Sequence, residues 1–169
     1  MRKGRMKMRT ILVCLSFLWL CGEFSFGQKV DREWLNEETW PAIVHNVPIE
    51  IAESDDPIQK LQKERVNACL DELRARYIYW LQGQGTLVSV CENANRLIAS
   101  RVDMGLTPDE ELELQKGRLA FAKRVMQQAD AIRTARGTTA SHIDEKYARY
   151  YRLDAELAVA QLQKNLTDQ

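Results

Sequence analysis

Apolar residues recur at alternating three- and four-residue spacings through most of residues 57–166, and this pattern limits the fold more than any other feature. The clearest run is Val66, Leu70, Leu73, Tyr77 and Trp80. Such spacing keeps one stripe of an α-helix apolar and suits packing against a second long helix. The chain also has only eight glycines and four prolines, too few for the many turns of an all-β protein. We expect an all-α fold, either an elongated antiparallel helical hairpin or an irregular four-helix bundle.

Two Gly-Thr pairs are expected to break the helices. Gly85 and Thr86 interrupt the first apolar run. Gly137 and Thr138, 52 residues further along the chain, interrupt a later one. Glycine lets the chain leave helical geometry, and a threonine that follows can cap the next helix. The first helix is expected to begin at Pro57, because proline is favoured at the first helical position.

The segment around residues 104–108 predicts the tip of a hairpin. Gly105 suits the left-handed residue that closes a helix. Thr107 is the expected N-cap of the next helix, Pro108 its first residue, and Glu110 its partner in a capping box. Two helices joined by so short a connection usually lie antiparallel.

The last helix carries an apolar set that we expect to face the core. Its members are Ile143, Tyr147, Tyr150, Leu153, Leu157 and Ala160. Tyr79 and Tyr151 fall beside the expected stripes. These two tyrosines are the candidates for an interaction surface that contacts another helix.

The N-terminus has the pattern of a signal peptide. A basic start precedes the apolar run 11–21, which is too short for a typical membrane-spanning helix. Ser25 and Gly27 place small residues at the −3 and −1 positions, so we expect cleavage after Gly27 and a periplasmic or secreted product. The alternative is an uncleaved segment that anchors the chain. Membrane contact is expected only through that segment.

The remaining boundaries follow from composition. Residues 28–56 contain Trp34, Trp40 and two prolines and are expected to form a loosely structured arm, followed by the helical domain 57–166 and a tail at 167–169. Cys69 and Cys91 are the two cysteines beyond the signal segment. We expect them to be small buried hydrophobes, and export would also permit a disulfide between them.

Around the second Gly-Thr pair the chain resembles the helical hairpins of the TolC-like outer-membrane efflux family. The matching stretch is residues 131–139 followed by residues 150–158, where alanine and leucine repeat along the helix. The resemblance implies an exported helical hairpin of the cell envelope. This chain has about half of the family's length and lacks the alternating strands of an outer-membrane barrel, so the resemblance does not extend to a conducting channel.

The sequence offers little for catalysis, metal binding or cofactor binding. His45 and His142 are the only histidines, and no nucleophile can be assigned to either. Glu110, Glu111 and Glu113 suit the positive end of a helix dipole better than a cation. Residues 28–169 carry 19 basic and 23 acidic side chains, so we expect no nucleic-acid partner.

These observations favour a non-enzymatic structural or interaction protein of the cell envelope. Its expected partner is another protein or a second copy of the chain, because a two-helix hairpin leaves apolar surface uncovered. The alternative is an accessory component of an envelope efflux or transport complex. No cofactor is expected in either case.

Overall fold

The computed structural model describes residues 41–136 and 139–168, and within them the regular secondary structure is all helix, with no strands. The helices are α2 (Ala42–His45), α3 (Pro57–Leu81), α4 (Leu87–Val102), α5 (Pro108–Arg136) and α6 (Thr139–Thr167). The predicted all-α class is therefore confirmed. The expected signal peptide, Trp34 and Trp40 lie outside the described residues, as do Gly137 and Thr138. Among the described helices, none has both the length and the apolarity needed to cross a membrane.

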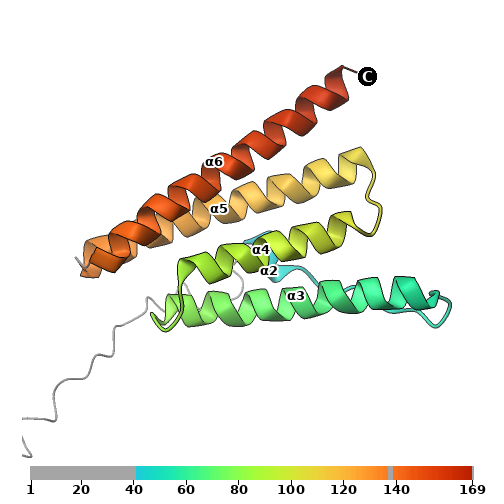
Figure 1. Ribbon diagram of the computed structural model, residues 1–169, viewed down its shortest axis with the longest axis horizontal. Coiled ribbons are helices and arrows are strands. Elements are labelled where there is room, and N and C mark those ends of the chain that lie inside the picture. Colours follow the sequence, from blue (N-terminus) through green and yellow to red (C-terminus); the bar gives the residue numbers. More distant parts are fainter. Residues whose placement is uncertain (1–40, 137–138, 169) are drawn as a thin grey trace, which may run out of the picture.

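The four long helices form two antiparallel hairpins, α3 with α4 and α5 with α6 (Figure 1). The chain reverses direction at the first Gly-Thr break. In a single elongated hairpin, the chain would continue in the same direction past this break. The bundle alternative is therefore the one that the structure adopts. Figure 1 shows α4 and α5 between the other two, so that α3 and α6 are the outer helices. Both α5 and α6 have 29 residues, which makes each about 43 Å long.

The core lies between the two hairpins. The predicted apolar stripes of α3 and α4 are buried, with Tyr77 and Leu73 fully enclosed. The Tyr77 ring lies 5.9 Å from the ring of Phe121 on α5, and its hydroxyl donates a 2.8 Å hydrogen bond to Gln128. Because Gln128 is only 2% exposed, this bond satisfies a polar group that burial would otherwise penalise.

Capping residues fix the helix ends as the sequence predicts. Thr86 accepts a hydrogen bond from the Ser89 amide at the start of α4. The left-handed residue before it is Gly83, with a φ of 77°, two residues ahead of the Gly-Thr pair. A Cβ at Gly85 would lie 3.3 Å from the backbone nitrogen of Trp80, a tight contact that glycine avoids.

The connection between α4 and α5 confirms the expected turn. Gly105 has a φ of 82°, the left-handed geometry that closes a helix. Thr107 and Glu110 form the predicted capping box: the Thr107 amide donates to the Glu110 carboxylate at 2.8 Å, and the Glu110 amide donates to the Thr107 hydroxyl at 3.3 Å. These bonds hold the pKa of Glu110 below its usual value. Pro108 is the first residue of α5.

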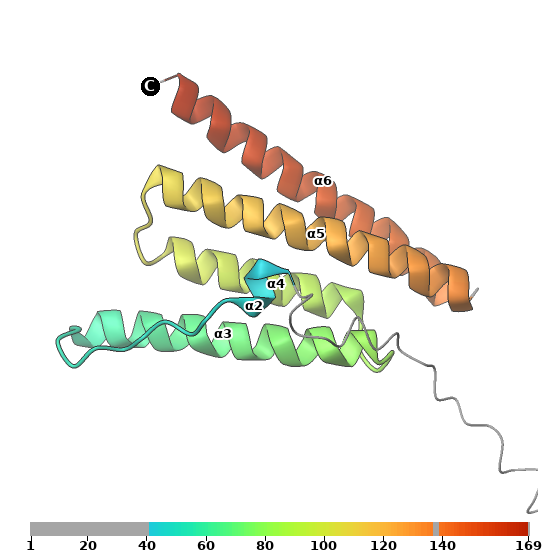
Figure 2. The ribbon, with the colours of Figure 1, turned by 180° about the vertical axis from the view of Figure 1, so that it is seen from behind.

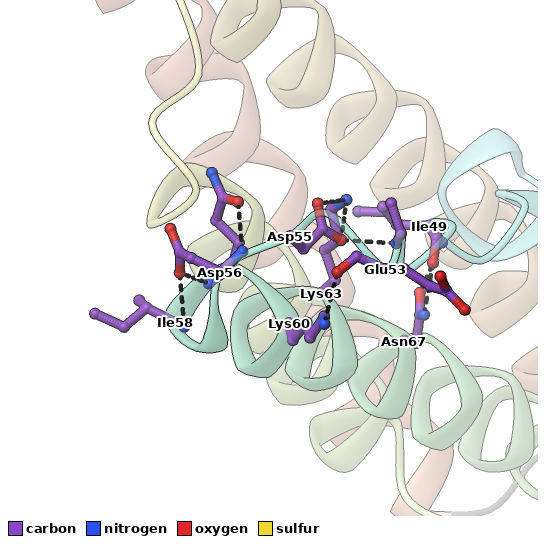
Figure 3. A network of polar contacts seen from close by, with 10 residues as sticks. Ile49, Glu53, Asp55, Asp56, Ile58, Lys60, Lys63 and Asn67 are labelled. Atoms are coloured by element: carbon purple, nitrogen blue, oxygen red, sulfur yellow. Dashed lines mark hydrogen bonds and ion pairs between the residues drawn. The ribbon is translucent and has the colours of Figure 1, made fainter.

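The segment between α2 and α3 is tied to the first turns of α3 (Figure 3). Asn67 accepts from the Ile49 amide at 2.8 Å and donates to the Ile49 carbonyl at 2.9 Å. Lys63 pairs with Asp55 at 2.7 Å and, as the main cause, lowers the pKa of that carboxyl. At the start of α3, Asp56 accepts from two backbone amides and Gln59 completes a capping box.

The short helix α2 was not predicted. It contacts both α5 and α3, on the side of the molecule seen in Figure 2. Ile43 and Val44 are buried, at 2% and 0% exposure. Part of the arm expected at 28–56 is therefore integral to the core.

Candidate interaction surface

Helix α6 carries apolar side chains on two faces. Its inner face packs on α5 and α4 and is made of Ala148, Tyr151, Ala155 and Val159. Its outer face is made of Ile143, Tyr150, Leu153 and Leu157, which are 64%, 64%, 48% and 55% exposed. Isolated exposed apolar residues are ordinary on protein surfaces, but four large ones along one line of a helix indicate a binding surface.

The predicted orientation of α6 was wrong except at Tyr147, which is half-buried and packs against the core. The set expected to face the core includes the whole outer face, and Tyr151, expected on an interaction surface, is only 2% exposed. The physical reason is the size of the inner residues. Ala148 and Ala155 are fully buried and let α6 approach α5 closely, because the distance between packed helices depends on the side chains at the contact.

A polar cluster fixes this orientation. The Arg118 guanidinium of α5 lies 5.1 Å from the centre of the Tyr151 ring and donates a hydrogen bond to Asp154 of α6. The ring of Phe121 meets Tyr151 edge-on, with their centres 6.4 Å apart. Burial raises the pKa of the Tyr151 phenol, as expected for an enclosed side chain. Turning α6 by half a turn would break all these contacts.

The N-terminal part of α6 is also anchored to the first hairpin. Burial raises the pKa of Asp144, and a hydrogen bond from Trp80 of α3 partly offsets that effect. Cys91 of α4 is fully buried nearby, and burial raises the pKa of its thiol. Among the described residues, helix α6 is therefore held by α5 and α4 on one side, and Figure 1 shows it as an outer helix of the bundle.

Helix α3 has an exposed apolar set of its own. Ile58, Leu61 and Tyr79 are 69%, 65% and 55% exposed, so the prediction that Tyr79 lies at the surface is confirmed. On the same face stand Arg65 and Glu72, which form ion pairs across to α4 with Asp103 and Arg96. These charges interrupt the stripe, so the outer face of α6 is the more continuous apolar surface.

Of the two histidines, only the side chain of His142 is described by the structure. His142 is exposed, and its Nδ1 lies 3.7 Å from a carboxylate oxygen of Glu145. His45 belongs to α2, and its side chain lies outside what the structure describes. Over residues 41–136 and 139–168, no three His, Cys, Asp or Glu side chains are placed to share a metal ion.

A groove of about 430 Å³ lies between α2, the end of α4 and the start of α5. Arg101, Asp109, Glu110 and Glu113 are its charged lining residues. The three acids, all in the first two turns of α5, complement the positive end of the helix dipole. Glu110 is already engaged by Thr107. None of the residues that line the groove is a serine, threonine, cysteine or histidine.

Comparison with protein-family models, with curated proteins and with solved structures finds no match for this chain. The candidate site therefore rests on geometry alone. Sequence reasoning missed the outer face because α6 carries two apolar stripes, and the stripe with larger residues was assigned to the core. The signal that separates them is the pair of alanines at 148 and 155, which marks the side of close approach.

Proposed function

We propose that this chain is an exported, non-enzymatic helical protein of the cell envelope that acts by binding a protein partner through the outer face of α6. The observation that carries the proposal is the line of four exposed apolar side chains on that face. Burying such side chains is favourable by roughly 25 cal/mol for each Å² of apolar surface removed from water. Export is supported by the signal-like pattern at residues 1–27.

Site-specific photo-cross-linking tests this proposal in the cells that encode the chain. A photoreactive amino acid at Leu157 is expected to give one discrete cross-linked product, in the envelope or secreted fraction. The same amino acid at Gln127, an exposed polar position of α5, is the matched control and is expected to give none. Mass spectrometry of the product identifies the partner. Absence of any product at Leu157, or equal products at both positions, would overturn the proposal.

The alternative is an accessory component of an envelope efflux or transport complex. It is supported by the resemblance to TolC-like hairpins and by the equal lengths of α5 and α6. The same experiment separates the two: a channel, pump or adaptor subunit cross-linked at Leu157 would favour the transport role.

A further inference from the structure

We infer that the occupant of the outer face of α6 is a second copy of this chain, packed as a symmetric antiparallel helix pair. The inference rests on the proposed function and names its partner. The exposed residues of α6 that repeat at three- and four-residue intervals are Ile143, Lys146, Tyr150, Leu153, Leu157, Ala160 and Lys164. This is the seven-residue repeat by which two helices pack along a seam. We call these seven residues the α6 seam.

The register of the pair is defined by the seam residues that face each other across the two-fold axis. With the two-fold axis between residues 151 and 152, Tyr150 of one copy lies opposite Leu153 of the second copy. The next layers then place Ile143 opposite Ala160 of the second copy, and Leu157 opposite the aliphatic stem of Lys146 of the second copy. Large residues thus meet smaller ones, and the lysine keeps its ammonium group at the edge, in water.

Charge complementarity supports this register. Arg149 and Glu156 flank the α6 seam on one side, and the same register places Arg149 of each copy beside Glu156 of the other. Arg149 is exposed. Glu156 accepts from Arg152 of its own helix through Oε1 at 2.8 Å, which leaves its other oxygen for the second copy. The two-fold axis makes this ion pair twice.

The parallel arrangement is disfavoured by the same residues. In a parallel pair, equivalent seam positions face each other, so Lys146 would meet Lys146 of the second copy and Lys164 would meet Lys164 of the second copy. Like charges facing each other at a seam oppose association. The exposed stripe of α3 is a poorer seam, since Arg65 and Glu72 stand within it and are already paired inside the chain.

Charge reversal tests the register. The full chain is purified and its mass is measured by light scattering over a concentration series. We expect a dimer, with Arg149→Glu and Glu156→Arg each weakening association about tenfold. The combined variant, which restores opposite charges, is expected to regain the original dissociation constant. Lys123→Glu, on an exposed position of α5, is the matched control and is expected to leave it unchanged.

Cross-linking at single cysteines tests the axis. Residue 153 lies about 4.5 Å along the helix from its counterpart in the second copy, and residue 157 about 16 Å. In a background whose four cysteines are replaced by alanine, a short bis-maleimide is therefore expected to link Leu153→Cys into dimers, with little product from Leu157→Cys or from the cysteine-free background. Circular dichroism confirms that each variant remains helical.

Three outcomes would overturn the inference: a monomer at every concentration, a dimer indifferent to both charge reversals, or no recovery in the combined variant. None of these outcomes would refute the proposed function, because that proposal is tested by the cross-linked product at Leu157 in cells. A heterologous partner in that product would keep the function and reject the second copy.

Discussion

The adjacent tyrosines of α6 give the sharpest test of its orientation. Tyr151 is 2% exposed and contacts Phe121 and Arg118, whereas Tyr150 is 64% exposed on the outer face. Replacing a buried aromatic residue by alanine typically costs about 3–5 kcal/mol, of which the aromatic pair accounts for about 0.5–1.5 kcal/mol. An exposed substitution usually changes stability by less than about 0.5 kcal/mol. We therefore expect Tyr151→Ala to destabilise the fold by about 4 kcal/mol and Tyr150→Ala to have little effect.

Urea and thermal unfolding followed by circular dichroism measure this difference. For a domain of this size, about 4 kcal/mol lowers the melting temperature by roughly 8–16 °C. The measurement belongs at protein concentrations where the melting temperature no longer depends on concentration, because dimerisation would otherwise add to the apparent stability. Equal losses for Tyr150→Ala and Tyr151→Ala would refute the assignment of the inner and outer faces. A larger loss for Tyr150→Ala would mean that α6 is turned the other way.

Three further substitutions and one chemical treatment test the local structure. Gly117→Ala is expected to stabilise the fold by up to about 1 kcal/mol, because the new methyl group meets nothing within 4 Å in mid-helix. Gly105→Ala should destabilise it by about 1 kcal/mol, because Gly105 has a φ of 82°. Denaturant unfolding in which both substitutions change stability in the same direction would contradict the turn. Glu110→Gln is expected to lower stability at pH 7, since the folded pKa of this carboxyl is depressed. Its contribution is present above the unfolded pKa near 4.5 and is lost as pH falls through the folded value. A stability difference between the two chains that does not shrink as the pH is lowered would argue against the cap. Alkylation of the native chain without reductant should modify Cys69 and spare Cys91, and alkylation of the unfolded chain should modify both. Peptide mass spectrometry identifies the modified cysteines. A disulfide-linked peptide would show that the register of the first hairpin is wrong.

The last of these predictions follows from the pairing of α3 with α4. Cys69 lies level with Ser100, its sulfur 3.6 Å from the serine oxygen, while Cys91 is nine residues away from Ser100 along the same helix. That separation is about 13 Å along the axis, and a disulfide requires Cα atoms within about 7 Å. The disulfide that export would permit is therefore excluded by geometry.

The sequence by itself determined the local features of this protein. Helix caps and tight turns depend on residues only a few positions apart, so they can be predicted from the sequence. Examples are the caps at Asp56, Thr86 and Thr107 and the left-handed turn at Gly105. The buried stripes of α3 and α4 were also predictable, because each of those helices has one continuous apolar stripe toward the core.

Only the tertiary structure decided which side of α6 faces inward and where the chain reverses. Periodicity indicates that a helix has an apolar stripe, but it does not indicate which of two stripes packs against a neighbouring helix. In α6 that choice depends on the fit of Ala148 and Ala155 against α5 and on the contacts of Arg118. Likewise, a Gly-Thr break permits a reversal or a continuation, and the burial of Tyr77 against Phe121 selects the reversal. Both choices depend on contacts between residues distant in sequence, and the physical reason is that close packing is a property of two surfaces rather than of one.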